Sequence, residues 1–473
     1  MSPPETPRPA PRPAPGIWQL AWPAVTANLL AALVAIVDMK IVGALGAPAV
    51  AAITTGNRIF FIVQALLIAV TAGTTALVAR AWGAGDRAEA ERVTRASLWL
   101  CMAIATAMSA VAFALPERLA GVFRVDADAV ALAATYIRWQ APFQIAFGVF
   151  YALGAALRAA GDTRTPLWIG ALTNVVNVAL AWTLVYGKLG FPALGVAGAA
   201  LAGGIAFAIG TVIFAGLWAR GRLLLARSGR LADALTRPRL RRIVDIGYPA
   251  GIEQLVWQSG FVAFLWIVSL YGTGAYAAYG IGVSLLSFSF VIGFGFSIAA
   301  STLVGQSLGA GDPAGATRAG WRAMRLSMGA MTAFGLAIVL TARPLARLMI
   351  DDETVVELTV TFIYVLGSAQ PLMAIEAALG GALRGAGDTR FPLFAVFAGL
   401  IGARVPLAGL FAWQGMAVEW IYAALIADYV VKVALLTARF RSGRWQSVVP
   451  GAPALAGAGD ARLEPAAVDP KSV

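Results

Sequence analysis

Histidine is absent from this chain of 473 residues, cysteine occurs once, and charged residues make up only 13% of the sequence. The single cysteine, Cys101, excludes an intramolecular disulfide, and no metal site can be built from cysteines and histidines. Without histidine, any proton transfer within the protein would depend on carboxylates. The sequence also lacks a nucleotide-binding P-loop and the HExxH zinc-hydrolase motif, so we expect neither a primary pump nor an enzyme.

The scarcity of charge accompanies a large apolar content. Hydrophobic residues make up 59% of the chain and the mean hydropathy is +0.77, whereas soluble domains contain roughly 25% charged residues. These values predict an all-α integral membrane protein. Twelve apolar stretches are long enough to cross about 30 Å of hydrocarbon, at residues 17–45, 47–79, 93–115, 128–158, 165–187, 192–219, 241–271, 274–307, 316–341, 353–384, 391–413 and 417–439.

The remaining segments are rich in proline, glycine or arginine. We expect disordered cytoplasmic tails at 1–16 and 442–473, and a basic cytoplasmic linker at 221–240. These segments divide the chain into an amino-terminal six-helix lobe (17–220) and a carboxy-terminal six-helix lobe (241–441).

The charge is unbalanced, with 36 Lys and Arg against 24 Asp and Glu. Arginines gather in alternate loops, which the positive-inside rule assigns to the cytoplasm together with both termini. Because the arginines are divided among many loops, we expect a lipid bilayer and no nucleic acid as partner. The expected location is a bacterial inner membrane, crossed many times by a monomer.

The two halves of the chain repeat each other. Residues 152–167 and 378–393 are identical at thirteen of sixteen positions, at an offset of 226. The same offset relates the Gly-Ala-Gly-Asp motifs at 83–86 and 309–312. The chain is therefore a duplicated six-helix unit. Since six crossings return the chain to the side on which it started, the two repeats are parallel.

Several of these motifs resemble the multidrug and toxic compound extrusion (MATE) family of transporters. They are the V-D-x-x-x-V-G-x-L-G stretch from Val37 to Gly46, the two Gly-Ala-Gly-Asp motifs, the L-R-G-A-G-D-T-R string at 383–390 and the G-V-A-G-A-A string at 195–200. These motifs are similar to those of the prokaryotic branch of the family, which includes the DNA-damage-inducible transporters. The resemblance implies two lobes in a V and export of amphipathic, often cationic, small molecules, driven by protons or sodium ions and without a cofactor.

The resemblance places cation coupling at Asp38, because the family's first-helix acid stands at this position; the repeat has Phe264 there. Asn177 matches a family asparagine that hydrogen-bonds near this acid. For Asn174, one turn away, two roles are open: it supplements the site, or it has a packing role alone. Ala181 stands where the family often has a second aspartate. One carboxylate with one amide is a poor sodium cage, which favours H⁺ over Na⁺, with sodium coupling as the alternative.

Further charged residues lie within predicted spans. Arg58 lies level with Asp38, and we hypothesise that the two pair in one transport state and separate in another; a structural arginine bonded to backbone carbonyls is the alternative. Glu253 and Glu376 are second-lobe candidates for coupling or substrate binding and could share a proton. They match the family's acids by helix but not by position. Asp428 is a weaker candidate.

A different function remains open, a flippase for a lipid-linked saccharide. It would need cationic residues in the cavity to hold a pyrophosphate, for which Arg58 and Arg404 are the candidates. An organic substrate would instead use aromatic side chains, for which the candidates are Trp257, Phe261, Trp266, Phe288, Phe290, Phe294 and Phe296.

Overall fold

A computed structural model describes residues 16–123, 126–225 and 231–448. The predictions for residues 1–15 and 449–473, and for 226–230 of the linker, lie outside the described residues. The first half contains α1 (Ile17–Gly43), α2 (Ala47–Gly83), α3 (Arg87–Ala114), α4 (Pro116–Ala120), α5 (Ala127–Gln140), η1 (Ala141–Phe143), α6 (Gln144–Ala159), α7 (Arg164–Tyr186) and α8 (Gly195–Ala219).

The short helix α9 (Leu231–Ala234) precedes the second half. That half contains α10 (Arg237–Ser269), α11 (Thr273–Gly309), α12 (Pro313–Leu340), α13 (Ala342–Met349), α14 (Glu353–Ser368), α15 (Gln370–Gly385), α16 (Arg390–Val396), the π-helical segment η2 (Phe397–Arg404), α17 (Val405–Trp413), α18 (Val418–Arg441) and η3 (Arg444–Ser447).

The predicted all-α class and the twelve spans are confirmed. Eleven helices of the described residues are long and apolar enough to cross a membrane, with α5, η1 and α6 taken as one helix and α16, η2 and α17 as another. The twelfth span is α14 with α15, which are bent by 48° at their junction, so the tenth predicted span is broken. Several helices begin before the apolar stretch does. Helix α3 begins at Arg87 instead of 93, because Asp86 accepts a hydrogen bond from the Glu89 amide at 2.8 Å and caps its polar first turn.

The duplication seen in the sequence is also present in the structure. Helices α6 and α15 begin at Gln144 and Gln370, and α7 and α16 begin at Arg164 and Arg390. All four positions keep the offset of 226 residues. The two lobes therefore share one helix order and interrupt the regular α-helix of their fourth span at the same place, by η1 in the first lobe and by the bend between α14 and α15 in the second.

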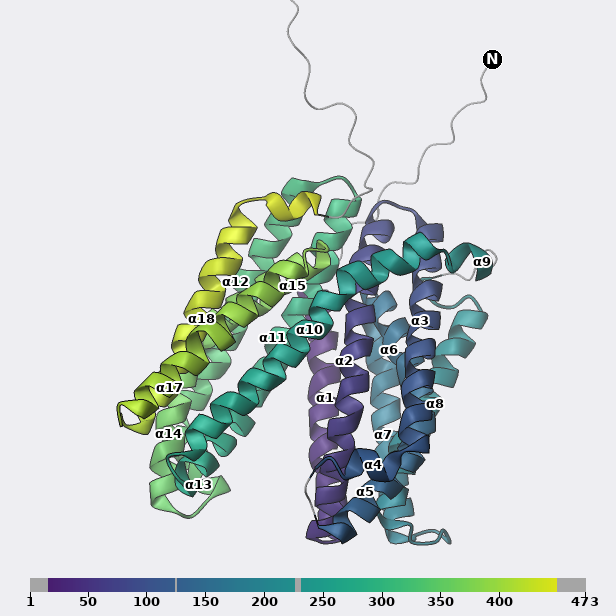
Figure 1. The fold of residues 1–473 in the computed structure, drawn as a ribbon. Helices are drawn as coiled ribbons and strands as arrows, with labels where there is room; N and C mark the ends of the chain where they lie inside the picture. The colour runs from purple at the N-terminus through teal and green to yellow at the C-terminus, as the bar shows by residue number, and fades with distance from the viewer. Residues whose placement is uncertain (1–15, 124–125, 226–230, 449–473) are drawn as a thin grey trace, which may run out of the picture.

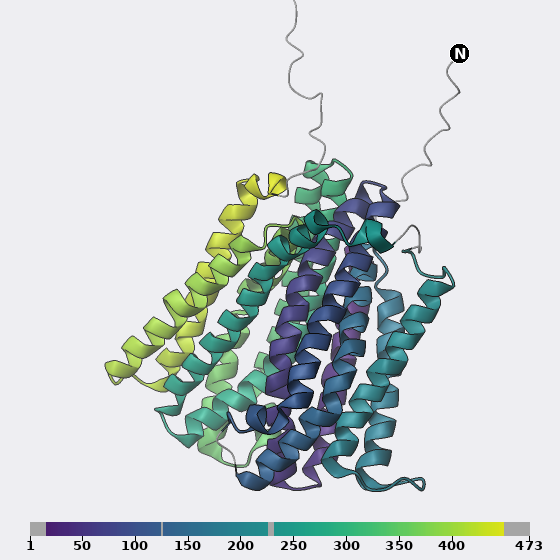
Figure 2. The same cartoon turned by 45° about the vertical axis from the view of Figure 1, so that its right-hand side comes forward.

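The two lobes form a V (Figure 1). They lie close together on the side where the described chain begins and ends, which we call the terminal side, and diverge toward the opposite, distal side. Figure 2 shows that the helices of both lobes run between these two sides. The V thus opens away from the chain ends.

Glycines let the lobes touch on the terminal side. A Cβ atom on Gly83 of α2 would lie 1.9 Å from the Gln306 carbonyl oxygen of α11, and one on Gly309 would lie 1.9 Å from the Arg80 carbonyl oxygen. The side-chain amide of Gln306 also donates a hydrogen bond to the Ala159 carbonyl oxygen at 2.8 Å. The two glycine contacts obey the twofold symmetry of the repeat and pack α2 against α11, backbone to backbone.

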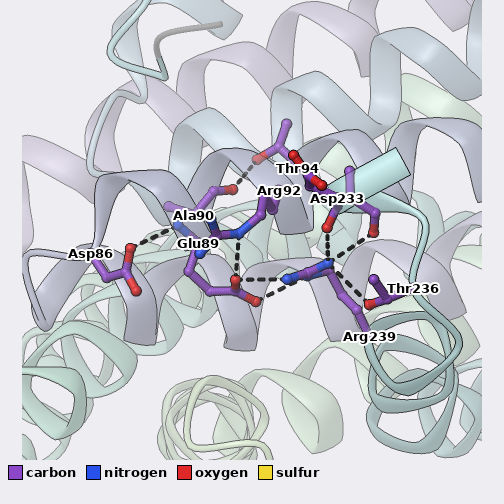
Figure 3. Close-up of polar contacts among 9 residues, drawn as sticks. Asp86, Glu89, Ala90, Arg92, Thr94, Asp233, Thr236 and Arg239 are labelled. Atoms are coloured by element: carbon purple, nitrogen blue, oxygen red, sulfur yellow. Dashed lines mark hydrogen bonds and ion pairs between the residues drawn. The ribbon is translucent and has the colours of Figure 1, made fainter. Parts of the chain in front are cut away.

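The segment that joins the lobes is attached to the first lobe (Figure 3). Arg239 near the start of α10 binds both carboxylate oxygens of Glu89 on α3, at 2.8 and 3.0 Å. Its other nitrogen donates to the Asp233 carbonyl oxygen at 2.7 Å. The connection between the halves is therefore held to the terminal end of α3.

Candidate functional site

Asp38 of α1 meets Asn177 of α7 inside the first lobe. The Asn177 side-chain amide donates to Asp38 Oδ2 at 2.7 Å. The two helices are fixed together nearby, because the Tyr186 hydroxyl donates to the Ile41 carbonyl oxygen at 2.8 Å. The contact expected from the resemblance is present, and a role of these residues in coupling stays a prediction.

The other carboxylate oxygen, Asp38 Oδ1, is buried and has no hydrogen-bond partner within the described residues. Asn177 faces Gly203, where a Cβ atom would lie 3.5 Å from its Oδ1 atom, and Ala181 one turn along is apolar and buried. A half-buried carboxylate that has one amide donor and no cation paired with it among the described residues is costly when charged. A preference of this site for a proton over a sodium ion, which needs several oxygen ligands, stays a prediction.

Two other predicted residues do not join Asp38 in this conformation. Arg58 is exposed, and no ion pair between it and Asp38 is formed in the part of the chain that the structure describes. Asn174 is half-buried, and its side chain makes no hydrogen bond to any described residue. Pairing of Arg58 with Asp38 in another transport state stays a prediction.

The two asparagines of α7 give a matched pair of variants. We expect Asn177→Ala to slow transport by about tenfold, because loss of a hydrogen bond to a charged group costs about 1.5–3 kcal/mol, and Asn174→Ala to change it less than about twofold. Initial efflux rates of the two variants at equal protein amounts test this. Equal losses in both would contradict a specific contact between Asn177 and Asp38.

In the second lobe, each predicted carboxylate lies against a cation. Glu253 of α10 is 6% exposed, and its Oε1 atom lies 2.6 Å from a guanidinium nitrogen of Arg384 on α15. Glu376 Oε1 lies 3.3 Å from Lys432 Nζ on α18. The structure thus shows two separate ion pairs at the carboxylates that the sequence predicted to share a proton, and their function stays a prediction.

Sequence reasoning missed Lys432, the centre of a larger buried cluster. Its Nζ atom lies 3.1 Å from Asp428 Oδ1, and Asp428 Oδ2 is paired with Arg404 at the end of η2. The side chains of Lys432 and Asp428 are 0% exposed and that of Arg404 is 3% exposed. The available signal was the spacing of an acid and a lysine four residues apart on one predicted helix. We call Glu376, Arg404, Asp428 and Lys432 the second-lobe charge cluster.

The backbone of η2 is shaped around this cluster. A Cβ atom on Gly399 would lie 2.3 Å from Asp428 Oδ1 and 2.7 Å from Lys432 Cγ. Any side chain there would displace the carboxylate. The π-helical turn brings Arg404 to Asp428, and such turns occur often at functional sites.

An apolar cavity of about 210 Å³ adjoins the charge cluster, with Arg404 in its wall. Aromatic and aliphatic side chains form the rest of the lining, namely Trp257, Phe261, Tyr279, Val283, Phe290, Phe362, Leu366, Leu425 and Tyr429. Three of the predicted aromatic residues are among them. Of the others, Trp266 is exposed and Phe296 is buried in the packing of α1 against α11.

The two repeats of this chain each match the same known protein family. The MatE family model matches residues 23–183 and 249–410, which is one match in each lobe and covers more than half of the chain. The chain belongs to the MatE family. The family predicted from the motifs is therefore confirmed.

Curated relatives and solved structures cover nearly the whole chain. A probable multidrug resistance protein NorM of Thermotoga maritima is 31% identical over 90% of this chain and 92% of its own length. One of the same name from Bradyrhizobium diazoefficiens is 30% identical over 85% and 88%. The crystal structure of the Vibrio cholerae MATE transporter VcmN in the bent form superposes with a TM-score of 0.83 at 22% identity, covering 91% of this chain and 97% of that one. This likeness shows that the chain has the fold of the MATE transporters.

Proposed function

We propose that this MatE protein is a secondary antiporter that exports amphipathic, often cationic, organic compounds in exchange for protons. The observation that carries the proposal is the half-buried Asp38 carboxylate, which has one amide donor and one oxygen without a partner among the described residues. A group in this setting can take up a proton in one state and release it in another. The relatives named as probable multidrug resistance proteins support the class of substrate.

The proposed topology has both termini in the cytoplasm of a bacterium and the protein in the inner membrane. The described chain begins and ends on one side of the bundle (Figure 1), and the arginine-rich loops lie on that side. The V that opens toward the distal side is then an outward-facing state. Exchange with a state open to the cytoplasm would separate α2 from α11.

The lining of the second-lobe cavity supports the proposal that the substrate is an organic compound. The cavity is lined by aromatic rings, and Arg404 in its wall is already paired with Asp428. A pyrophosphate in this cavity would need a cation in its wall that is free to bind it. An apolar pocket with a small number of polar groups is the usual form of a site for such ligands.

Filling the cavity should reduce transport of aromatic compounds. Val283→Trp adds a large ring to the lining, and we expect about tenfold slower efflux of a bulky aromatic cation such as ethidium. Val262→Trp, at a residue that is 52% exposed on α10, is the control with the same change. Efflux of ethidium at the wild-type rate by the Val283→Trp variant would remove the cavity from the substrate pathway.

The direct test of the proposed function uses purified protein in liposomes loaded with ethidium. A pH gradient, a sodium gradient or no gradient is imposed across the same membrane. We expect efflux to follow the pH gradient and to ignore the sodium gradient. Efflux that follows sodium alone would contradict proton exchange, and no efflux of any organic cation would contradict the proposed substrate class.

A further inference from the structure

The second-lobe charge cluster surrounds the ammonium group of Lys432 as a binding site surrounds a ligand. We propose that Lys432 Nζ is a tethered occupant of a monovalent-cation site, so that the second lobe takes up no free cation while Lys432 is in place. The site consists of Glu376, Asp428, Trp257 and Tyr429. Its ligand class, once the lysine is removed, is a primary alkylammonium ion.

The first support is the geometry around the nitrogen. Lys432 Nζ lies 3.1 Å from Asp428 Oδ1 and 3.3 Å from Glu376 Oε1. It also lies 4.6 Å from the centre of the Trp257 ring and 5.1 Å from that of Tyr429. Two carboxylates and two aromatic rings are the groups that proteins use to bind ammonium ions. They come from α10, α15 and α18, so three helices build the site.

The second support is the charge balance. Within the cluster, the negative charges of Asp428 and Glu376 are matched by the positive charges of Lys432 and Arg404. The neighbouring pair of Glu253 and Arg384 is also neutral. Removing only the lysine ammonium leaves one negative charge in the interior, and an uncompensated buried charge is strongly destabilising. One monovalent cation restores the balance.

The third support is that the residues of the cluster are present in the second repeat and not at the equivalent positions of the first. At the offset of 226, the residues that correspond to Trp257, Glu376 and Arg404 are Ala31, Phe150 and Val178. Conversely, Asp38 of the first lobe corresponds to Phe264. The first lobe thus contains the Asp38 carboxylate, which forms no ion pair with any described residue, whereas the second contains carboxylates with a cation supplied by the chain itself.

This arrangement has a consequence for coupling. If the second lobe carries its own cation, the exchangeable cation site lies at Asp38, and each transport cycle moves one coupling ion. The consequence rests on the proposed antiport. The occupancy of the site by Lys432 does not, because it concerns binding alone.

The test measures cation binding by the melting temperature of the purified protein in detergent. All variants carry Asp38→Asn, so that the first-lobe carboxylate binds nothing. Each is titrated with n-butylammonium chloride, which reproduces the removed lysine side chain, with NaCl, and with choline chloride as an ionic-strength control. We expect the Asp38→Asn protein to show no saturable response to butylammonium or Na⁺. The Asp38→Asn/Lys432→Ala protein should gain about 3 °C in a saturable manner with butylammonium, and less with Na⁺.

The control with a retained cation is Asp38→Asn/Lys432→Arg, which should respond to neither ion. A saturable Na⁺ or butylammonium response of the Asp38→Asn protein would show that the second lobe binds a free cation with Lys432 present, and would overturn the proposal. So would a folded Lys432→Ala variant that responds to neither ion. Should that variant not fold, the titrations of the Asp38→Asn and Asp38→Asn/Lys432→Arg proteins still test whether the second lobe binds a free cation while position 432 carries a positive charge. Failure of proton-driven efflux would refute the proposed function and leave these binding results unaffected.

Discussion

The Asp38→Asn variant is expected to lose proton-driven efflux by about 100-fold or more. Asparagine has nearly the shape of aspartate and keeps a partner for Asn177, but it cannot take up or release a proton. A group that transfers the proton commonly contributes about 10²–10⁴-fold to a rate. The measurement is the initial rate of ethidium efflux from liposomes under an imposed pH gradient, at equal amounts of reconstituted protein.

The matched control is Asp128→Asn, an exposed carboxylate near the start of α5. We expect this variant to transport at the wild-type rate. An Asp38→Asn protein with full proton-driven efflux would remove coupling from the first lobe. Coupling would then have to lie at the second-lobe carboxylates Glu253 and Glu376.

The Gly309→Val variant is expected to reduce transport by about tenfold or more, because a Cβ atom at this position would lie 1.9 Å from the Arg80 carbonyl oxygen. Helix α11 could no longer touch α2 on the terminal side. Overpacking costs about 1–3 kcal/mol, and about 1.4 kcal/mol shifts a two-state equilibrium tenfold. The protein would be displaced from the conformation in which the two lobes touch on the terminal side, and the rate of the proposed transport cycle would fall. Efflux rate and melting temperature are measured together.

Gly280→Val provides the control for the helix itself. Gly280 is on α11 as well, and a Cβ atom there would meet nothing within 4 Å. The Gly280→Val variant carries the same change in helix propensity as Gly309→Val and should leave efflux nearly unchanged. By the symmetry of the repeat, Gly83→Val should behave as Gly309→Val does. Wild-type transport by both Gly309→Val and Gly83→Val would show that the close approach of α2 and α11 is not needed for the cycle.

Much of the fold could be predicted from local patterns. Apolar runs located the spans, and the repeat at an offset of 226 residues located equivalent helices in the two lobes. Asp38 and Asn177 could be paired because motif positions in the family place them on neighbouring helices. What hydropathy did not reveal is the break between α14 and α15, since both sides of a bend can be equally apolar.

The second-lobe charge cluster could not be predicted in the same way. Its members come from α15, η2 and α18, and the helical period says which face of a helix is polar but not which helices meet. Lys432 stands among apolar residues with an acid four positions earlier, which is also typical of a surface pair. Arg384 stands at the very end of the predicted span 353–384, yet in the structure it reaches Glu253 of α10. Such long-range partners depend on tertiary packing.

The most direct test of proton exchange at Asp38 is proton movement driven by the substrate itself. Liposomes with a pH-sensitive dye inside receive ethidium on one side only, with no imposed pH or sodium gradient. We expect that ethidium moving down its gradient drives protons the opposite way, that the signal is the same with and without Na⁺, and that Asp38→Asn abolishes it. Ethidium movement without any proton movement in the wild-type protein, or an unchanged proton signal in Asp38→Asn, would contradict it.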